Sequence, residues 1–227
     1  MSTIIRAVRP PEEPARSFAY RVLVFYISEL FFQPGERLVE SEIAAQLGVS
    51  RTPVHDTFLQ LSHEKLLTVG PRSACVPLLR PDNVRQLCWM HRTTGIAVLD
   101  QLFTHRPATS ALEPLERCVA AEYDMLASGS LANAARLNWE FYAELYKLAG
   151  YYPVYRALYR AGSDLYRLYR LSEDRASWQY ITDQNALLVQ ALGMHNHEDA
   201  CVALTRQFDL VEPMLEDCRR RVPQYFV

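Results

Sequence analysis

Four polar residues that lie close together in the sequence have the types and spacing needed to contact DNA: Ser50, Arg51, Thr52 and His55. An arginine can donate two parallel hydrogen bonds to guanine or to a phosphate, and a serine or threonine hydroxyl can donate one to a phosphate. If a helix begins at Ser50, its first amide N–H groups are unpaired and add partial positive charge at the same place. His55 follows Arg51 by one helical turn, so we expect it to face the same groove.

The sequence around these residues predicts the helices that would position them. Apolar residues recur at helical spacing from Ala19 until Gln33-Pro34-Gly35 stops the helix. A shorter helix is expected over residues 40–47, and Gly48 separates it from a third helix that begins at Ser50 as its N-cap. The third helix of such a group enters the major groove of DNA.

Two short apolar runs follow the third helix, at residues 66–69 and 74–79. They predict a hairpin with Arg72 and Ser73 at its turn, where the arginine can reach a phosphate or the minor groove. Three helices followed by a hairpin are the element order of a winged helix-turn-helix. We therefore predict this fold for residues 19–79.

The stretch from Gln33 to Val54 resembles the DNA-binding domain of the GntR family of bacterial regulators. The resemblance implies a transcriptional regulator that binds palindromic double-stranded operator DNA as a homodimer. One departure matters, because His55 and Asp56 stand where the family has arginine and glutamate. Since histidine changes its charge with pH, we expect His55 to contact a different base or to bind more weakly at higher pH. The expected DNA-contacting residues are Ser41, Ser50, Arg51, Thr52, His55, Arg72 and Ser73.

Composition narrows the class of protein. The net charge is only -2, so the case for DNA binding rests on where the charges lie rather than on their sum. Five scattered cysteines predict neither a disulfide framework nor a thiolate zinc site, and they indicate a reducing cytoplasm. No membrane span or secretory signal is visible. Residues 1–18, with the proline-rich stretch at 10–14, are expected to form a flexible, exposed arm.

Residues 80–227 are expected to form an all-helical bundle that serves effector binding and dimerisation, so the chain as a whole should be mainly α. No segment of this part alternates with the period of a strand. The six helical segments that we expect span residues 82–105, 111–128, 131–149, 152–172, 176–193 and 198–220.

This second part resembles the effector domain of the FadR-like branch of the same family, the FCD type. The resemblance rests on Asn138–Tyr146, on Gln184–Leu192 and on Gln207-Phe208. In metal-binding members an aspartate and three histidines at matching positions hold a divalent ion. Here those positions carry Asn138, Tyr142, Asn185 and Gln207, which are poor metal ligands at neutral pH. The resemblance therefore implies a site without a metal or cofactor.

Two interpretations of these four side chains remain open. They can form a pocket that binds a small organic molecule, such as a carboxylate, by hydrogen bonds, or they can satisfy one another in a packed core. Further candidates for the pocket are His91 or Arg92, one of which should point inward from the first bundle helix, and Arg167.

Three functions compete. The leading one is a ligand-responsive regulator, and the second is a DNA-binding dimer whose bundle has lost its ligand or binds a protein. The third, a helical enzyme, lacks support, because no nucleophile with a nearby base, carboxylate pair or glycine-rich phosphate loop stands out. No catalytic residue is predicted.

Overall fold

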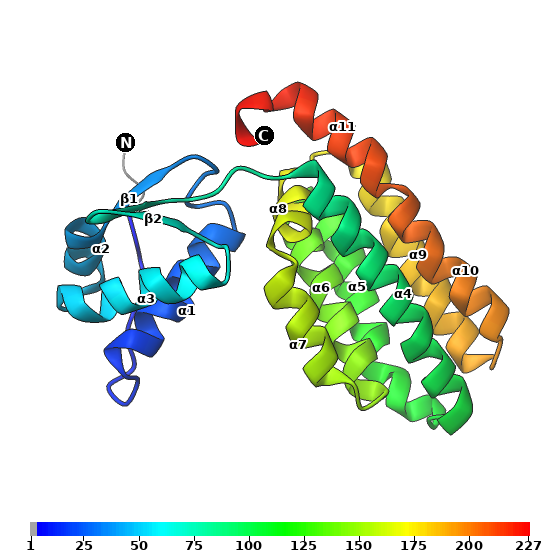
Figure 1. Ribbon diagram of the computed structural model, residues 1–227. Coiled ribbons are helices and arrows are strands. Elements are labelled where there is room, and N and C mark those ends of the chain that lie inside the picture. The colour runs from blue at the N-terminus through cyan, green and yellow to red at the C-terminus, as the bar shows by residue number, and fades with distance from the viewer. Residues whose placement is uncertain (1–3) are drawn as a thin grey trace. The chain divides into compact units, whose positions relative to one another are not determined.

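The computed structural model describes residues 4–227, and these are mainly helical (Figure 1). The chain divides into two compact units. The first comprises the residues up to Arg80 together with Val222–Val227, and the second is Pro81–Arg221. Within the described residues, no helix combines the length and the apolar character needed to cross a membrane.

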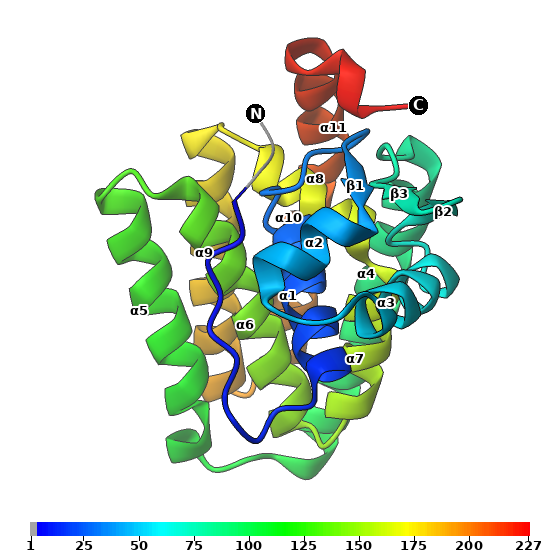
Figure 2. The same ribbon diagram turned by 90° about the vertical axis from the view of Figure 1, so that its left-hand side faces the viewer.

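The first unit has the predicted winged helix-turn-helix (Figure 2). Its wing contains one strand more than the hairpin, because the segment before the second helix pairs with the last strand. The three strands form an antiparallel sheet in the order β1-β3-β2. In chain order the elements are α1 (Ala15–Ser28), β1 (Arg37–Val39), α2 (Glu40–Leu47), α3 (Arg51–His63), β2 (Thr68–Gly70) and β3 (Ser73–Cys75).

Apolar residues at helical spacing hold α1 and α3 together. Phe18, Leu23 and Ile27 of α1 and Phe58 and Leu61 of α3 are all completely buried in one core. Burying a side chain of this size stabilises a fold by about 1.5–3 kcal/mol. The orientation of α3, and hence of its exposed face, is fixed by this packing.

Both ends of the chain add to the first unit. Helix α1 begins at Ala15, earlier than Ala19, and Ile5 of the expected arm is buried in the core with its N–H donated to Gln46 Oε1 over 2.7 Å. Residues 1–3 of the arm lie outside the described residues. Beyond the bundle, Leu79 pairs with the C-terminal segment, donating its N–H to Tyr225 O over 2.8 Å.

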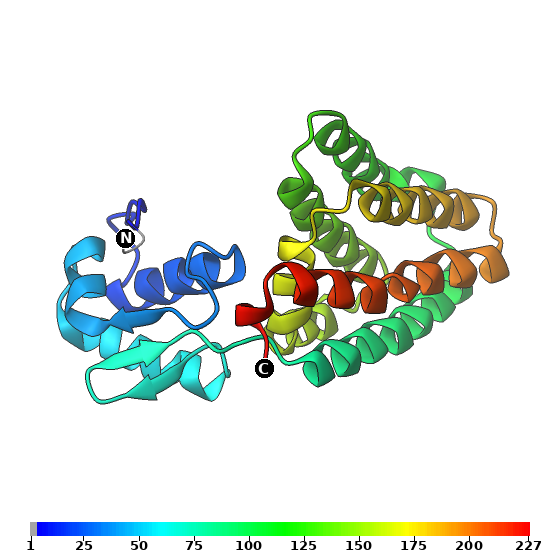
Figure 3. The same cartoon turned by 90° about the horizontal axis from the view of Figure 1, so that it is seen from above.

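The second unit is the predicted all-helical bundle. Helices α5 and α6 pack side by side, as do α9 and α10, and α4 packs against α10 (Figure 3). A short 3-10 helix lies at Thr109–Leu112, and another, Pro223–Tyr225, belongs to the C-terminal segment of the first unit. The helices are α4 (Pro81–His105), α5 (Glu113–Ala127), α6 (Leu131–Leu148), α7 (Tyr152–Ala161), α8 (Ser163–Leu171), α9 (Arg175–Gly193), α10 (His197–Asp209) and α11 (Val211–Arg221).

Two of the expected helical segments are divided in the structure. The segment 152–172 breaks at Gly162, where a Cβ atom would lie only 2.8 Å from the carbonyl oxygen of Leu158. The segment 198–220 breaks at Leu210, three residues before Pro213. Proline has no N–H to donate, and its ring clashes with the carbonyl four residues earlier, so a continuous helix is disfavoured there.

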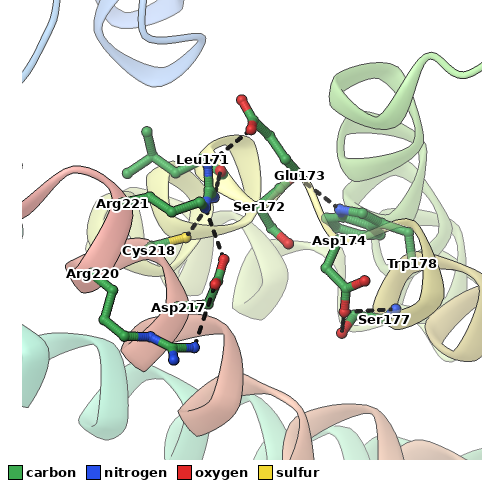
Figure 4. Close-up of polar contacts among 10 residues, drawn as sticks. All are labelled: Leu171, Ser172, Glu173, Asp174, Ser177, Trp178, Asp217, Cys218, Arg220 and Arg221. Carbon is green, nitrogen blue, oxygen red and sulfur yellow. Dashed lines mark hydrogen bonds and ion pairs between the residues drawn. The ribbon is translucent and has the colours of Figure 1, made fainter.

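Arg221, the last residue of α11, ties that helix to the loop between α8 and α9 (Figure 4). Its guanidinium donates to Leu171 O over 2.6 Å and to Asp217 Oδ2 over 2.8 Å, and it pairs with Glu173 at 2.9 Å. In the same loop Asp174 caps α9 by accepting from the backbone N–H of Ser177. These contacts fix the end of the bundle at the residue after which the chain rejoins the first unit.

Candidate functional site

The beginning of α3 is exposed and carries three of the predicted DNA-contacting residues. Ser50, Arg51 and Thr52 all face solvent. Ser50 occupies the N-cap position with an extended backbone, as predicted, but its side chain forms no capping hydrogen bond among the described residues. The first N–H groups of α3 are therefore available to an anion such as a phosphate.

His55, one turn further along α3, forms an ion pair with the first residue of α2. Its Nδ1 lies 2.8 Å from Glu40 Oε1, and the His55 side chain keeps 51% of its surface exposed. The hydrogen bond to Glu40 raises the pKa of His55, and the charges of Glu40 and Asp56 add to the effect. The backbone N–H of Glu40 donates to Arg72 O, which links this pair to the wing.

The wing turn presents Arg72 to solvent in an unusual backbone conformation. Gly70 pairs with Ser73, so Pro71 and Arg72 form the turn, and Arg72 has a φ of 62°. This left-handed region costs a residue with a side chain about 1–2 kcal/mol relative to glycine. An arginine retained there is a functional candidate. Ser73 is half-buried in the sheet, and Ser41 is half-buried in the first turn of α2.

In the bundle, the four side chains at the positions of the family's metal ligands come together as predicted by the resemblance. Asn138 and Tyr142 lie on α6, Asn185 on α9 and Gln207 on α10, each at most 4% exposed. They form a directed chain of hydrogen bonds: Tyr142 O–H donates to Gln207 Oε1 (3.0 Å), Gln207 Nε2 to Asn185 Oδ1 (2.8 Å), and Asn185 Nδ2 to Asn138 Oδ1 (3.0 Å).

Asn185 also donates to a carboxyl group that the sequence analysis did not identify. Glu122 of α5 is 1% exposed, and its two oxygens lie 3.1 and 3.0 Å from Asn185 Nδ2. Burial raises the pKa of Glu122 to about 8, against the lowering effect of its hydrogen bonds. A signal for it was present, because Glu122 stands on the apolar stripe of α5 with Leu115, Val119 and Leu126.

The cluster of Glu122, Asn138, Tyr142, Asn185 and Gln207, called the amide cluster below, joins four helices by hydrogen bonds. Within the described part of the chain, no group of three or more His, Cys, Asp or Glu side chains is arranged to hold a metal ion. Amide side chains link the helices at this place.

The other predicted ligand-binding residues separate into one that adjoins the amide cluster and two that are engaged elsewhere. His91 of α4 is 2% exposed, and its ring stacks on Phe208 and lies 6.4 Å from that of Tyr142. Arg92 pairs instead with Asp209 at 2.8 Å, so His91 is the inward residue of the two. Arg167 is buried in an ion pair with Asp164 at 2.5 Å.

On the α4 side of the amide cluster, Nε2 of His91 and Nε1 of Trp139 have no hydrogen-bond partner among the described residues. The two rings are edge to face with centroids 5.0 Å apart, and Trp139 is 4% exposed. Burial lowers the pKa of His91 to about 4, so the ring is neutral at pH 7. Trp139 is also a residue that the sequence analysis did not identify.

Comparison with known proteins concerns mainly the first unit. Residues 16–76 match the family described as bacterial regulatory proteins of the gntR family. An HTH-type transcriptional regulator from Agrobacterium vitis is 38% identical over 60 residues, which are 26% of this chain and 35% of that protein. The HTH-type transcriptional repressor RspR of Escherichia coli is 32% identical over 62 residues, 27% of each protein. The matched part is thus about a third or less of the relatives' length, and they are named as regulators, in agreement with the expectation of a non-enzyme.

Solved structures extend the likeness to the fold of nearly the whole chain. E. coli McbR/YncC superposes with a TM-score of 0.76 at 18% identity, covering 90% of this chain and 99% of that one. Lar, which controls expression of the Listeria monocytogenes agr system, superposes with a TM-score of 0.64 at 15% identity, covering 92% and 99%. At these identities the likeness concerns fold alone. Residues 16–76, which form the winged helix-turn-helix, are thus similar in sequence to the gntR family of bacterial regulatory proteins.

Proposed function

We propose that this chain is a transcriptional regulator that binds palindromic operator DNA as a homodimer through α3 and the wing, and that responds to a small organic molecule without a metal. The observation that carries the DNA-binding part is the exposed start of α3. There Arg51, Thr52 and His55 share one face with uncapped N–H groups, and Arg72 is exposed at the wing turn. This arrangement suits contacts to bases by side chains and to phosphates by the helix end.

A gel-shift titration tests DNA binding with duplex DNA from the region upstream of the gene. Arg51→Ala should weaken binding by about 10- to 100-fold, since a bidentate arginine–guanine contact contributes about 1–3 kcal/mol. Arg117→Ala is the matched control, because Arg117 is exposed on α5 and pairs with Glu113 one turn earlier on the same helix. The proposal fails if wild-type protein binds this DNA no better than an unrelated duplex.

The two unpartnered atoms beside the amide cluster support the effector part of the proposal. A buried polar atom without a hydrogen bond costs about 1–3 kcal/mol, so a core that needs no ligand is expected to avoid such atoms. A ligand carboxylate between α4 and α6 could accept from Trp139 Nε1 and, if His91 takes up a proton or carries it on Nε2, from His91 as well. The donors at this place therefore match the hydrogen-bonding chemistry of a small organic acid.

A thermal-shift screen of small aliphatic and aromatic carboxylates tests the effector proposal. The expected result is a rise in melting temperature with one group of acids, together with a change in the gel shift. Trp139→Phe should abolish the rise, because phenylalanine keeps an aromatic ring at this position but has no N–H to donate. Trp89→Phe is the control, since Trp89 is 66% exposed on α4.

A second function is favoured by the amide cluster itself. Its side chains satisfy one another from Tyr142 to Glu122, as expected for a bundle that serves only for assembly or for binding another protein. Under this alternative no acid in the screen changes the melting temperature or the DNA affinity. The Trp139→Phe variant would then also bind DNA as the wild type does.

A further inference from the structure

The ion pair between α2 and α3 sets the hydrogen-bonding character of the histidine that faces DNA. Glu40 Oε1 lies 2.8 Å from His55 Nδ1, and Glu40 is the more buried partner, with 14% of its side chain exposed against 51% for His55. An ionised carboxylate can only accept a hydrogen bond. The proton of a neutral His55 ring must therefore sit on Nδ1, which leaves Nε2 as the outer nitrogen.

We propose that His55 is a pH-dependent specificity residue, whose Nε2 accepts a hydrogen bond from a DNA base when the ring is neutral and donates one when the ring is protonated, with Glu40 as its positioning residue. This inference rests on the proposed DNA binding through α3. Arg51 and Thr52, its neighbours at the exposed start of α3, keep their donors throughout the relevant pH range, so His55 alone among these three can change from acceptor to donor.

The neutral and the protonated His55 ring should pair with different bases in the major groove. Adenine and cytosine present amino groups there, which donate to an acceptor such as neutral Nε2. Guanine presents two acceptors, O6 and N7, which pair with a donor such as protonated Nε2. One position in each half of the binding site should accordingly prefer guanine at low pH and adenine or cytosine at high pH.

The charged groups around His55 favour the protonated ring. Glu40 faces it from α2, and Asp56 adds negative charge from α3, while Arg51 lies one turn earlier on the same helix. From the wing, the nearest link is the backbone oxygen of Arg72, which accepts from the N–H of Glu40. The raised pKa of His55 places the change of preference above the ordinary histidine value of about 6.5.

Selection from a random duplex library by the full chain tests the inference, at about pH 6 and about pH 8.5, on either side of the ordinary histidine pKa. For wild type, the guanine preference at one position should fall by about tenfold at the higher pH, and adenine or cytosine should replace it. His55→Arg should select guanine at both values, because arginine remains a donor. Glu40→Gln, which keeps an acceptor beside Nδ1 but removes the charge, should shift the midpoint of the change to lower pH.

The results separate this inference from the proposed function. If wild type enriches a sequence that is identical at both pH values, the pH-dependent preference is wrong and DNA binding stands. If the same change of base occurs with His55→Arg, it arises from another group, and the assignment to His55 is overturned. Failure of wild type to enrich any duplex would overturn the DNA-binding proposal and this inference with it.

Discussion

The exposed surface at the start of α2 and α3 and the buried centre of the bundle each contain a histidine and a glutamate, but the charge state of these side chains is controlled in opposite ways. On α3, His55 pairs with Glu40 in contact with solvent, and its pKa rises. In the bundle, His91 and Glu122 have no opposite charge as a cause of their pKa shifts, and burial moves both toward the neutral form. Burial and pairing, rather than residue type, decide whether such a group carries charge.

Because one region is exposed and the other buried, mutations in the two regions should have different effects. Changes at the exposed face should alter DNA binding with little effect on folding, because those side chains have little buried contact to lose. Changes in the amide cluster should alter stability first, because each of its side chains is hydrogen-bonded to another buried side chain. The following predictions test that separation, from the largest expected effect to the smallest.

Replacing Asn185 should have the largest effect, because Asn185 bonds to Glu122, Asn138 and Gln207 at once. Asn185→Leu has a similar volume but leaves these three partners unsatisfied, at a total cost of about 4 kcal/mol in the free energy of unfolding. Urea denaturation followed by circular dichroism measures it. Gln190→Leu, on the exposed side of α9, is the control and should change stability by less than about 0.5 kcal/mol. Equal effects of the two changes would show that the amide cluster contributes nothing specific.

Glu122 should make the bundle less stable as the solution becomes alkaline. Its pKa in the folded chain is raised to about 8 from 4.5, so between these values the folded state binds more protons than the unfolded state. Stability then falls as pH rises, by about 3 kcal/mol between pH 5 and pH 8. Glu122→Gln mimics the protonated form and should remove this loss. If the stability of Glu122→Gln depended on pH as strongly as that of the wild type over this range, the titrating group would not be Glu122.

His91 should act in the opposite direction, on the acid side. Its pKa is lowered to about 4 from 6.5, so between these values the unfolded state binds more protons than the folded state. The stability contributed by this group is therefore lost as pH falls from about 6.5 toward 4, by about 2 kcal/mol, which offsets the opposite effect of Glu122 over most of that interval. His91→Phe should flatten this part of the stability profile, and fluorescence of the adjacent Trp139 reports the transition. Together with Glu122, His91 predicts that the bundle is most stable between about pH 4.5 and 6.5, where the two opposite effects cancel, and loses stability above that range.

Helices and turns whose ends are defined by a few neighbouring residues were predictable from the sequence. Gly48 has a φ of 64° at the end of α2, as expected for a helix that stops on glycine, and α2 and α4 begin within a residue of their predicted starts. The turn between α2 and α3, with Pro53 in the first turn of α3, likewise follows from residue type and spacing. These features depend on a few neighbouring residues, and a single sequence contains them.

What could not be predicted depends on contacts between distant segments. Strand β1 exists because Leu38 pairs with Ala74, and the C-terminal segment pairs with Leu79; neither partner is marked locally. Asn138 and Asn185 were located only through resemblance. Glu122 was missed because a glutamate among exposed acidic residues suggests a solvated surface, although its place on an apolar stripe predicted burial.

The smallest effect is expected at Arg72, and it tests the separation of binding from stability most directly. Arg72→Gly removes the strain of a φ of 62° and should raise the free energy of unfolding by about 0.5–1 kcal/mol. The same change removes an exposed guanidinium, so binding to DNA should weaken uniformly across sequences, and the salt dependence of binding should fall by about one unit. Arg72→Ala loses the guanidinium but keeps the strain, so it should weaken binding equally without the gain in stability. If Arg72→Gly left DNA affinity unchanged, the strained conformation at the wing would need an explanation within the fold. The wing would then not belong to the exposed DNA-binding face that is contrasted here with the buried centre of the bundle.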